Sequence, residues 1–318
     1  MKRMAAEAIV LALWFTAVVF APLGAQVSTL REIPLAANRP SDALASNLAG
    51  SGPEAVAFDG AYVWVAEQFA NTVTRIDPLT GLRTGTFAVG TRPVALLCLG
   101  TTLWVANLES DTLTRLRTTD GALLGTVKVG DGPGGLAFDG THVWVANRNR
   151  NSVTKVSTTG LVVGTFPTGR RPMNIAFDGT NVWVVINHRN TVVKLRRSDG
   201  ALLDQVRVGD GPFGILYDGS SIWVTNFFSR SVTKIRPSDG VVLGTYPVGD
   251  GPAGLATDGT TLWVANNGSS TVTRLDRATG AVLETHSTGK GPFHIVFDGR
   301  NMWVANFGGG SLSTTLGW

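Results

Sequence analysis

The sequence predicts an all-β protein, a seven-bladed β-propeller built from four-stranded antiparallel blades. A Trp-Val pair recurs seven times at spacings of 40, 40, 39, 40, 40 and 40 residues, with its tryptophans at Trp64, Trp104, Trp144, Trp183, Trp223, Trp263 and Trp303. Each copy contains several strand-like runs and lacks the 3.6-residue apolar period of helical repeats. Repeats of about 40 residues with this composition are typical of propeller blades.

One unit, residues 130 to 169, shows how a blade is expected to form. Four runs have strand composition, at residues 133 to 138, 141 to 146, 152 to 156 and 161 to 167. The pair Asp139-Gly140 supplies the turn residues of a tight hairpin between the first two. In the second run His142, Trp144 and Ala146 share one face, while valines occupy the other. We therefore expect this strand to be covered on both faces by neighbouring blades.

The last copy ends without a fourth strand, which predicts how the ring closes. Its third strand lies near residues 311 to 315, and the chain stops at Trp318. The segment from Leu30 to Leu35 resembles the outer strand of the other units, so we expect it to complete the last blade and leave no open edge. The expected organisation is a signal peptide at 1–25, the closing strand and linker at 26–49, and the propeller at 50–318. The expected blades are 50–89, 90–129, 130–168, 169–208, 209–248, 249–288 and 289–318.

The first 25 residues have the pattern of a secretory signal peptide. Lys2 and Arg3 precede an apolar run from Ala8 to Phe20, and cleavage is expected after Ala21 or Ala25. An uncleaved membrane anchor is the alternative, although the run is shorter than the ~20 residues that a spanning helix needs. No later segment is apolar enough to span a membrane. We therefore expect a secreted or periplasmic protein, and a monomer.

The charge of the chain argues against nucleic acid as a partner. The 27 basic and 23 acidic residues give a net charge of +4, and removing Lys2, Arg3 and Glu7 leaves +3. The basic residues are spread around the repeats rather than clustered. Six copies carry a basic residue in the third strand, which we interpret as a position where the stem of the side chain packs. The single cysteine, Cys98, excludes an internal disulfide and is expected to be buried and inert.

Functional residues are expected where the copies disagree on the face formed by the loops after the second and fourth strands. One such position follows the second strand. We assign Asn to it in six copies, as Asn107, Asn147, Asn187, Asn226, Asn266 and Asn306, and Glu67 in the first. Asn is a common turn residue. Glu67 is a metal ligand, a general base or a chance substitution.

A second position lies two residues after the proline that opens each inner strand. It is occupied by Ala55, Ala95, Gly135, Asn174, Gly214, Gly254 and His294. Small residues are expected there because inner strands crowd the axis, and Asn174 and His294 break the rule. His294 lies in the seventh blade, beside the first blade with Glu54 and Glu67. Together these residues could bind one divalent metal such as Mg²⁺ or act as an acid/base pair, whereas a lone His is more often structural.

The loop face also carries basic and aromatic residues. We predict ligand contacts from Arg148, His188, Arg189, Phe213, Phe227, Phe293 and Asn174. This composition suits an anionic or aromatic small molecule, or an acidic protein partner. Scattered loop residues of this kind are equally compatible with ordinary surface.

The phrases WVAN at Trp104 to Asn107, TVTRIDPLTG at Thr72 to Gly81 and VGTRP at Val89 to Pro93 resemble YVTN-type propeller repeats of secreted bacterial proteins. The resemblance covers residues 50 to 318. The chain also resembles the streptogramin B lyase group, seven-bladed propellers that open a cyclic depsipeptide by elimination with a metal held by His and Glu residues. This resemblance implies a catalytic role for His294, and a carboxylate role for Glu67.

Three functions are therefore compatible with the sequence. The first is binding of a small ligand or protein partner at the loop face and channel mouth. The second is a metal-dependent lyase or lactone hydrolase that uses His294, Glu67 and Glu54. The third is a non-catalytic scaffold.

Overall fold

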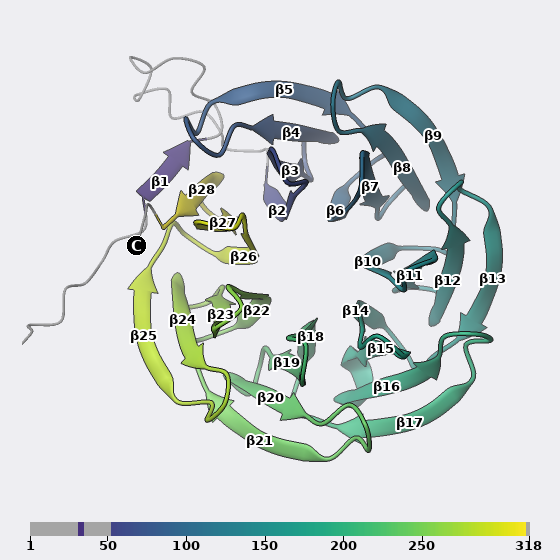
Figure 1. The fold of residues 1–318 in the computed structure, drawn as a ribbon, viewed down its shortest axis with the longest axis vertical. Helices are drawn as coiled ribbons and strands as arrows, with labels where there is room; N and C mark the ends of the chain where they lie inside the picture. Colours follow the sequence, from purple (N-terminus) through teal and green to yellow (C-terminus); the bar gives the residue numbers. More distant parts are fainter. Residues whose placement is uncertain (1–30, 35–51, 316–318) are drawn as a thin grey trace, which may run out of the picture.

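The computed structural model describes residues 31–34 and 52–315, which form a closed ring of seven four-stranded antiparallel sheets (Figure 1). The expected fold is confirmed. Within each sheet the chain runs from the strand nearest the axis to the strand at the rim. Among the described residues, no helix has the length and apolar character needed to cross a membrane. The expected signal peptide at 1–25 and most of the linker lie outside the described residues.

Each blade contributes four consecutive strands, ordered from the axis outward. Blades 1 to 3 are β2 (Pro53–Phe58), β3 (Val63–Glu67), β4 (Thr72–Ile76) and β5 (Arg83–Ala88); β6 (Pro93–Leu99), β7 (Thr102–Asn107), β8 (Thr112–Arg117) and β9 (Leu123–Lys128); β10 (Pro133–Phe138), β11 (His142–Asn147), β12 (Ser152–Ser157) and β13 (Val162–Pro167). Blades 4 and 5 are β14 (Pro172–Phe177), β15 (Asn181–Ile186), β16 (Thr191–Arg196) and β17 (Leu202–Arg207); β18 (Pro212–Tyr217), β19 (Ile222–Asn226), β20 (Ser231–Ile235) and β21 (Val242–Pro247). A short 3₁₀ helix, η1 (Asn187–Arg189), joins β15 to β16.

The last two blades close the ring. Blade 6 is β22 (Pro252–Thr257), β23 (Thr261–Asn266), β24 (Thr271–Asp276) and β25 (Val282–Ser287), and blade 7 is β26 (Pro292–Phe297), β27 (Met302–Asn306), β28 (Ser311–Thr314) and β1 (Arg31–Pro34). β1 runs antiparallel to β28, with Arg31 opposite Thr314 and Pro34 opposite Ser311. The amino-terminal segment thus supplies the missing outer strand, as the sequence predicted, and covers the free edge of β28.

The repeated tryptophans are fixed by the turns between the first two strands of each blade. In blade 3 the Asp139 carboxylate accepts hydrogen bonds from the backbone amides of Thr141 and His142, at 2.8 and 2.7 Å, and from Trp144 Nε1 at 2.8 Å. Gly140 has a φ of 89°, which glycine adopts without strain. The same Asp–Trp bond occurs in every blade except blade 2, where Leu99 takes the place of the Asp. Each such Asp holds a turn and an inter-blade side chain together.

The basic residues of the third strands pack on these tryptophans. Lys155 Nζ lies 5.2 Å from the centre of the Trp144 ring and donates to the carbonyl oxygen of Arg197, in the next blade, at 2.8 Å. Equivalent residues of four other blades, Arg75, Arg115, Lys194 and Lys234, also combine a tryptophan ring with a carbonyl of the next blade. They connect neighbouring blades, which confirms the packing interpretation of these positions.

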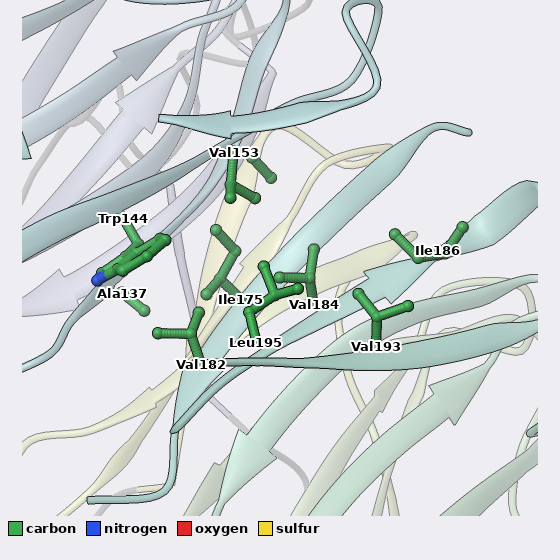
Figure 2. Close-up of a cluster of buried hydrophobic side chains, with 10 residues drawn as sticks. Ala137, Trp144, Val153, Ile175, Val182, Val184, Ile186, Val193 and Leu195 are labelled. Atoms are coloured by element: carbon green, nitrogen blue, oxygen red, sulfur yellow. The ribbon is translucent and has the colours of Figure 1, made fainter. Parts of the chain in front are cut away.

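The hydrophobic core is divided among the interfaces between blades. Between blades 3 and 4 the buried cluster includes Trp144, Val182, Ile186 and Val193, with Phe166 packed against it (Figure 2). Figure 2 shows Ile186 and Val193 side by side at the end of the cluster remote from Trp144. This cluster has ten buried members, compared with seven at the interface of blades 1 and 2. The extra apolar residues extend it toward the loop face.

Candidate functional site at the axial channel

The inner strands crowd the channel at the position where Asn174 and His294 were predicted to stand out. A Cβ on Gly135 would lie 2.5 Å from the Cα of Asn174, and a Cβ on Gly254 would lie 2.9 Å from the Cα of His294. Small residues on the preceding blades therefore create the room for the two larger polar residues. All seven inner strands also have a register shift just after the proline, which re-aims the residues at this level.

Glu54 and Arg148 face each other at the loop-side mouth of the channel. Glu54 follows the proline of β2 and is buried. Gly134 holds the same position in β10, and the Arg148 side chain covers it so closely that a Cβ there would clash with Arg148 Nε. Arg148 Nε is buried without a hydrogen-bond partner. No direct ion pair between Glu54 and Arg148 occurs among the described residues, so their charges interact only at longer range.

Burial changes the protonation of this pair. Desolvation raises the pKa of Glu54 to about 7, although the positive charges of Arg148 and Arg92 oppose the rise. Burial also lowers the pKa of Arg148, against the attraction of Glu54, and an arginine still remains protonated at neutral pH. Glu54 therefore changes charge near neutrality while Arg148 stays positive.

Two further arginines at the mouth were missed by the sequence analysis. Arg92 and Arg171 precede the inner-strand prolines of blades 2 and 4, where the other five blades have glycine. Their φ angles are 58° and 60°, a left-handed conformation that costs a non-glycine residue roughly 1–2 kcal/mol. The amide of Arg171 is held by Asn151 Oδ1 at 3.0 Å. Replacement of glycine by arginine at a strained position was the readable signal.

Aromatic rings complete the mouth on the opposite side. Phe213 and Phe293, which follow the prolines of blades 5 and 7, meet edge to face with ring centres 5.1 Å apart. Phe293 also contacts Phe307 at 6.0 Å, and Phe307 contacts Phe69 at 5.7 Å. The residue of the intervening blade, Ala253, is fully buried beneath them. The predicted contacts Phe213 and Phe293 thus lie together with Arg148 around one opening.

Beyond this mouth the channel contains a cavity of about 480 Å³. Its lining is mainly apolar and includes Leu96, Ile175, Leu216 and Phe297, with the polar exceptions Asn174 and His294. The cavity extends from the level of Asn174 and His294 toward the Asp-Gly turns. A volume of this size is in the range of small-molecule sites.

Cys98 also lines this cavity, contrary to the expectation that it lies buried in the packing between blades. Its side chain is half-buried because β6 presents it to the axis. Burial and the charge of Asp59 raise the pKa of the Cys98 thiol to about 12. The thiol is therefore protonated at neutral pH and is a poor nucleophile.

The two polar residues of the cavity differ in how their hydrogen-bonding groups are satisfied. Asn174 Nδ2 donates to the carbonyl oxygen of Phe213 in the next blade at 3.0 Å. The His294 ring bonds to the backbone of Val56, while its Nδ1 is buried without a partner. Desolvation lowers the pKa of His294 to about 4, although the bond to Val56 opposes the shift. At neutral pH this imidazole is neutral and has one free nitrogen.

Glu67 is occupied by bonds within its own blade. Its carboxylate accepts hydrogen bonds from Thr74 Oγ1 at 2.5 Å and Thr72 Oγ1 at 3.3 Å, and lies 3.5 Å from Arg83 Nη2. These partners belong to β4 and β5, away from the inner strand. In five other blades an Asn makes the corresponding bonds to hydroxyl groups of the third strand. Glu67 therefore has the contacts of a structural residue.

The predicted metal ligands do not form a suitable donor set. Glu67 is bonded to threonines and an arginine, Glu54 faces arginines, and His294 bonds to Val56. Among residues 31–34 and 52–315, no group of three or more His, Cys, Asp or Glu side chains is arranged to hold a metal ion. The presence of Mg²⁺ in the protein stays a prediction for elemental analysis.

The remaining predicted contacts lie farther out on the loop face. His188 and Arg189 are exposed on η1, after the second strand of blade 4. Phe227 follows β19, where its ring packs on Phe228 at 5.4 Å and lies against Gly251. The predicted ligand-binding residues thus divide into a group at the mouth, Arg148, Asn174, Phe213 and Phe293, and an outer group.

The assignment of Asn187 to the ring of asparagines is wrong. β15 ends at Ile186, which pairs with Thr191 as Asn147 pairs with Ser152 in blade 3. Asn187 is the next residue and begins η1, where its Nδ2 donates to the carbonyl oxygen of Pro212 at 3.0 Å. The 39-residue spacing before Trp183 had no part in this error. Aligning by residue type placed Asn with Asn, whereas the strand register places Ile186 there.

The architecture has solved counterparts. Streptogramin B lyase superposes with a TM-score of 0.75 at 18% identity, over 90% of this chain and 96% of that one. The chain shares the fold of streptogramin B lyase. A catalytically inactive virginiamycin B lyase from Staphylococcus aureus, determined with quinupristin, gives 0.76 at 18% over 90% and 98%.

The same fold occurs in another setting. Hydrazine synthase from Kuenenia stuttgartiensis superposes with a TM-score of 0.74 at 22% identity, over 84% of this chain and 96% of that one. No protein-family model and no curated protein sequence matches the chain. At these identities the likeness establishes the seven-bladed propeller, as expected from the resemblance, and no activity.

The shifted pKa of Glu54 gives a testable pH dependence. The folded protein holds the Glu54 proton up to about pH 7, whereas the unfolded chain releases it near 4.5. The stabilisation is thus complete below 4.5 and is lost as the pH rises to 7, by about 3 kcal/mol for a shift of this size. We expect Glu54→Gln to remove this loss in urea unfolding between pH 4.5 and 8. An unchanged slope would show that Glu54 is ionised in the folded state.

His294 provides the opposite control. Its folded pKa is depressed, so its contribution is present above pH 6.5 and is lost as the pH falls toward 4. His294→Phe should flatten the acid side of the stability profile and leave the rise between pH 7 and 4.5 attributed to Glu54 intact. The two variants therefore separate the two groups.

Proposed function

We propose that the protein binds a small, largely apolar molecule in the axial channel, with a hydrogen-bond donor of the ligand at His294. The observation that carries this proposal is the neutral His294 with its unpaired Nδ1, lining a cavity of about 480 Å³. A buried nitrogen without a partner costs free energy that a ligand donor recovers. The apolar lining would hold the body of the ligand.

The charges at the mouth narrow the ligand further. Three arginines, Arg92, Arg148 and Arg171, surround one carboxyl, Glu54, which is half protonated near pH 7. The mouth is therefore positively charged. An acidic group on the ligand, placed between Arg148 and Glu54, would satisfy the buried Arg148 Nε. We propose a ligand with an apolar body and one anionic group.

The cellular setting of this function remains that of the sequence prediction. We propose an exported binding protein, secreted or periplasmic, because of the signal-like segment at residues 1–25. Amino-terminal sequencing of the protein recovered from the native cell envelope and medium would identify both the cleavage site and the compartment.

The binding proposal predicts a specific loss in His294→Phe. The phenyl ring keeps the size and removes the hydrogen-bond acceptor, so affinity for a channel ligand should fall about tenfold, the value of one buried hydrogen bond. We would measure 8-anilinonaphthalene-1-sulfonate, an aromatic anion, by fluorescence titration at pH 7.5 and use it to screen competing compounds. His188→Phe makes the same chemical change on exposed η1 and should leave affinity unchanged.

Two further results would decide whether the probe occupies the channel. Asn174→Gly introduces the residue that blades 5 and 6 carry at this level, so it should fold and weaken binding by altering the same cavity. Equal affinity in wild type, His294→Phe and Asn174→Gly would reject the channel as the binding site.

A second candidate is acid/base catalysis in the same channel, in the manner of a lyase or lactone hydrolase. It is favoured by the separation of pKa values between Glu54, at about 7, and His294, at about 4. Glu54 would hold or release a proton at neutral pH, and His294 would accept one. Turnover of cyclic esters and lactones that is lost in Glu54→Gln would support this function, whereas binding without turnover would leave the binding function.

A further inference from the structure

Blade 4 departs from the other blades at two positions that touch each other. In five blades the Asn at the end of the second strand donates through Nδ2 to two hydroxyl groups of the third strand, as Asn147 does to Ser152 at 3.1 Å and Thr154 at 2.8 Å. In blade 4 the corresponding Asn and inner hydroxyl residue are Ile186 and Val193. A polar network has been replaced by an apolar pair, which Figure 2 shows side by side.

The replacement leaves one hydroxyl without its partner. Thr191 pairs with Ile186 in the strand register and corresponds to Ser152 of blade 3. Its side chain is only 6% exposed, and Thr191 Oγ1 is buried with no hydrogen-bond partner. A buried unsatisfied hydroxyl is costly unless another molecule completes it.

These residues line a pocket on the outer part of the interface between blades 3 and 4. Its volume is about 620 Å³, and its walls include Phe166 of blade 3 together with Ile186, Val193 and Leu195 of blade 4. Leu202, which is 60% exposed, extends the apolar wall on β17. The pocket is separate from the axial channel, with which it shares no lining residue.

The loop-side end of the pocket is positively charged. Arg170 and Arg189 line it and are both exposed, and neither forms an ion pair or side-chain hydrogen bond with another described residue. The one acidic residue of the lining, Asp199, is paired with Arg196 at 3.1 Å. Thr191 opens β16 and Arg189 precedes it by two residues, so the unpaired hydroxyl and the arginines lie at the same end.

The equivalent groove of blade 5 shows that shape alone does not produce this chemistry. It also has a volume of about 620 Å³. There Asn226 donates to Thr233 at 2.9 Å, and Arg230 Nε is bound to Asp250 at 2.6 Å. Its hydroxyl groups and its arginine are therefore already satisfied. Blade 4 alone of the two combines an apolar floor with free cationic groups.

We propose that the pocket between blades 3 and 4 is a second binding site, for a monocarboxylate with an extended apolar chain. The carboxylate lies between Arg170 and Arg189 and accepts a hydrogen bond from Thr191 Oγ1. The chain runs along Val193 and Leu195 toward Leu202, following β16 from the loop side. Guanidinium groups suit carboxylates because they donate in a planar fork, and the apolar wall excludes short hydrophilic anions.

The first experiment compares three probes with the same chain and different head groups. Decanoate, decanol and decyltrimethylammonium would be titrated into the mature protein at pH 7.5 below their micellar concentrations, with binding followed by calorimetry. We expect decanoate to bind with 1:1 stoichiometry at this pocket and at least tenfold more tightly than decanol. Equal affinities for decanoate and decanol would overturn the anionic specificity, and preference for the cation would overturn the proposal.

The second experiment restores the repeat. Ile186→Asn with Val193→Thr recreates the network of blades 3 and 5, so the variant should fold with an unchanged or raised midpoint of thermal unfolding and lose decanoate binding at least tenfold. Arg170→Gln with Arg189→Gln should lose the preference for decanoate over decanol. Undiminished decanoate binding in either double variant would overturn the assignment of the site.

Location is tested with the channel variant. His294→Phe should leave decanoate affinity at the blade 3–4 pocket unchanged, because the pocket and the channel share no residues. A loss of decanoate binding in His294→Phe that is absent in Ile186→Asn with Val193→Thr would place the carboxylate in the channel and reject the second site.

Discussion

Trp144→Ala is expected to lower the free energy of unfolding by about 3–5 kcal/mol, the range for removing a large aromatic side chain from a core. Trp144 is 0% exposed and lies between blades 3 and 4, where it contacts Phe166 with ring centres 5.6 Å apart. Its removal leaves a cavity at the interface and strips Asp139 Oδ2 of a hydrogen bond in a buried place. Lys155 loses the ring beneath its ammonium group.

Urea unfolding at pH 7.5 would measure this loss, with two matched variants. Trp144→Phe keeps most of the apolar volume and removes the Nε1 donor, so it should cost less, about 1–3 kcal/mol. Leu161→Ala changes a side chain that is 70% exposed and should shift stability by less than about 0.5 kcal/mol. Similar costs for Trp144→Ala and Leu161→Ala would refute the packing role of the tryptophan.

Removal of the closing strand is expected to have the second large effect. Deleting residues 26–35 takes β1 from blade 7 and exposes the edge of β28 along all four paired positions. At about 1 kcal/mol net for each backbone hydrogen bond, the free energy of unfolding should fall by about 2–4 kcal/mol. The uncovered edge should also promote self-association, since an unpaired strand can pair with another chain.

Both consequences can be measured on the same sample. Thermal unfolding would report the stability, and sedimentation at increasing concentration would report the self-association. A synthetic peptide of residues 26–36 added in trans should restore both properties, whereas a peptide with the same composition in scrambled order should not. A deletion variant as stable and as monomeric as the parent would show that β1 contributes nothing to ring closure.

The candidate site was only partly predictable from the sequence. His294 and Asn174 were recognised because they interrupt a column of small residues, and the structure places both in the lining of the channel. Arg92 and Arg171 were missed, although each replaces a glycine at a repeat position. The emphasis on Glu67 came from its being the one carboxylate at its position, and its three partners on β4 and β5 became visible only in the fold.

The blade 4 pocket was missed for a different reason. Asn187 was matched to the asparagines of the other blades by residue type, which hid Ile186 at that position. A hydrophobic residue in a strand also reads as ordinary core. Its meaning depends on Thr191 and Val193, which lie across the strand pair, and on Phe166 of the neighbouring blade.

The sequence by itself determined the number of blades, the order of strands within each, the positions of the inter-blade tryptophans and the segment that closes the ring. These features follow from a period near 40 residues and from local turn and strand chemistry, which every copy states again. Only the tertiary structure decided which polar groups remain unsatisfied. The free Nδ1 of His294, the buried Arg148 Nε and the unpaired Thr191 hydroxyl each depend on atoms from another strand or blade. Burial and hydrogen bonding are set by distances between residues remote in sequence, and a repeat pattern does not contain those distances.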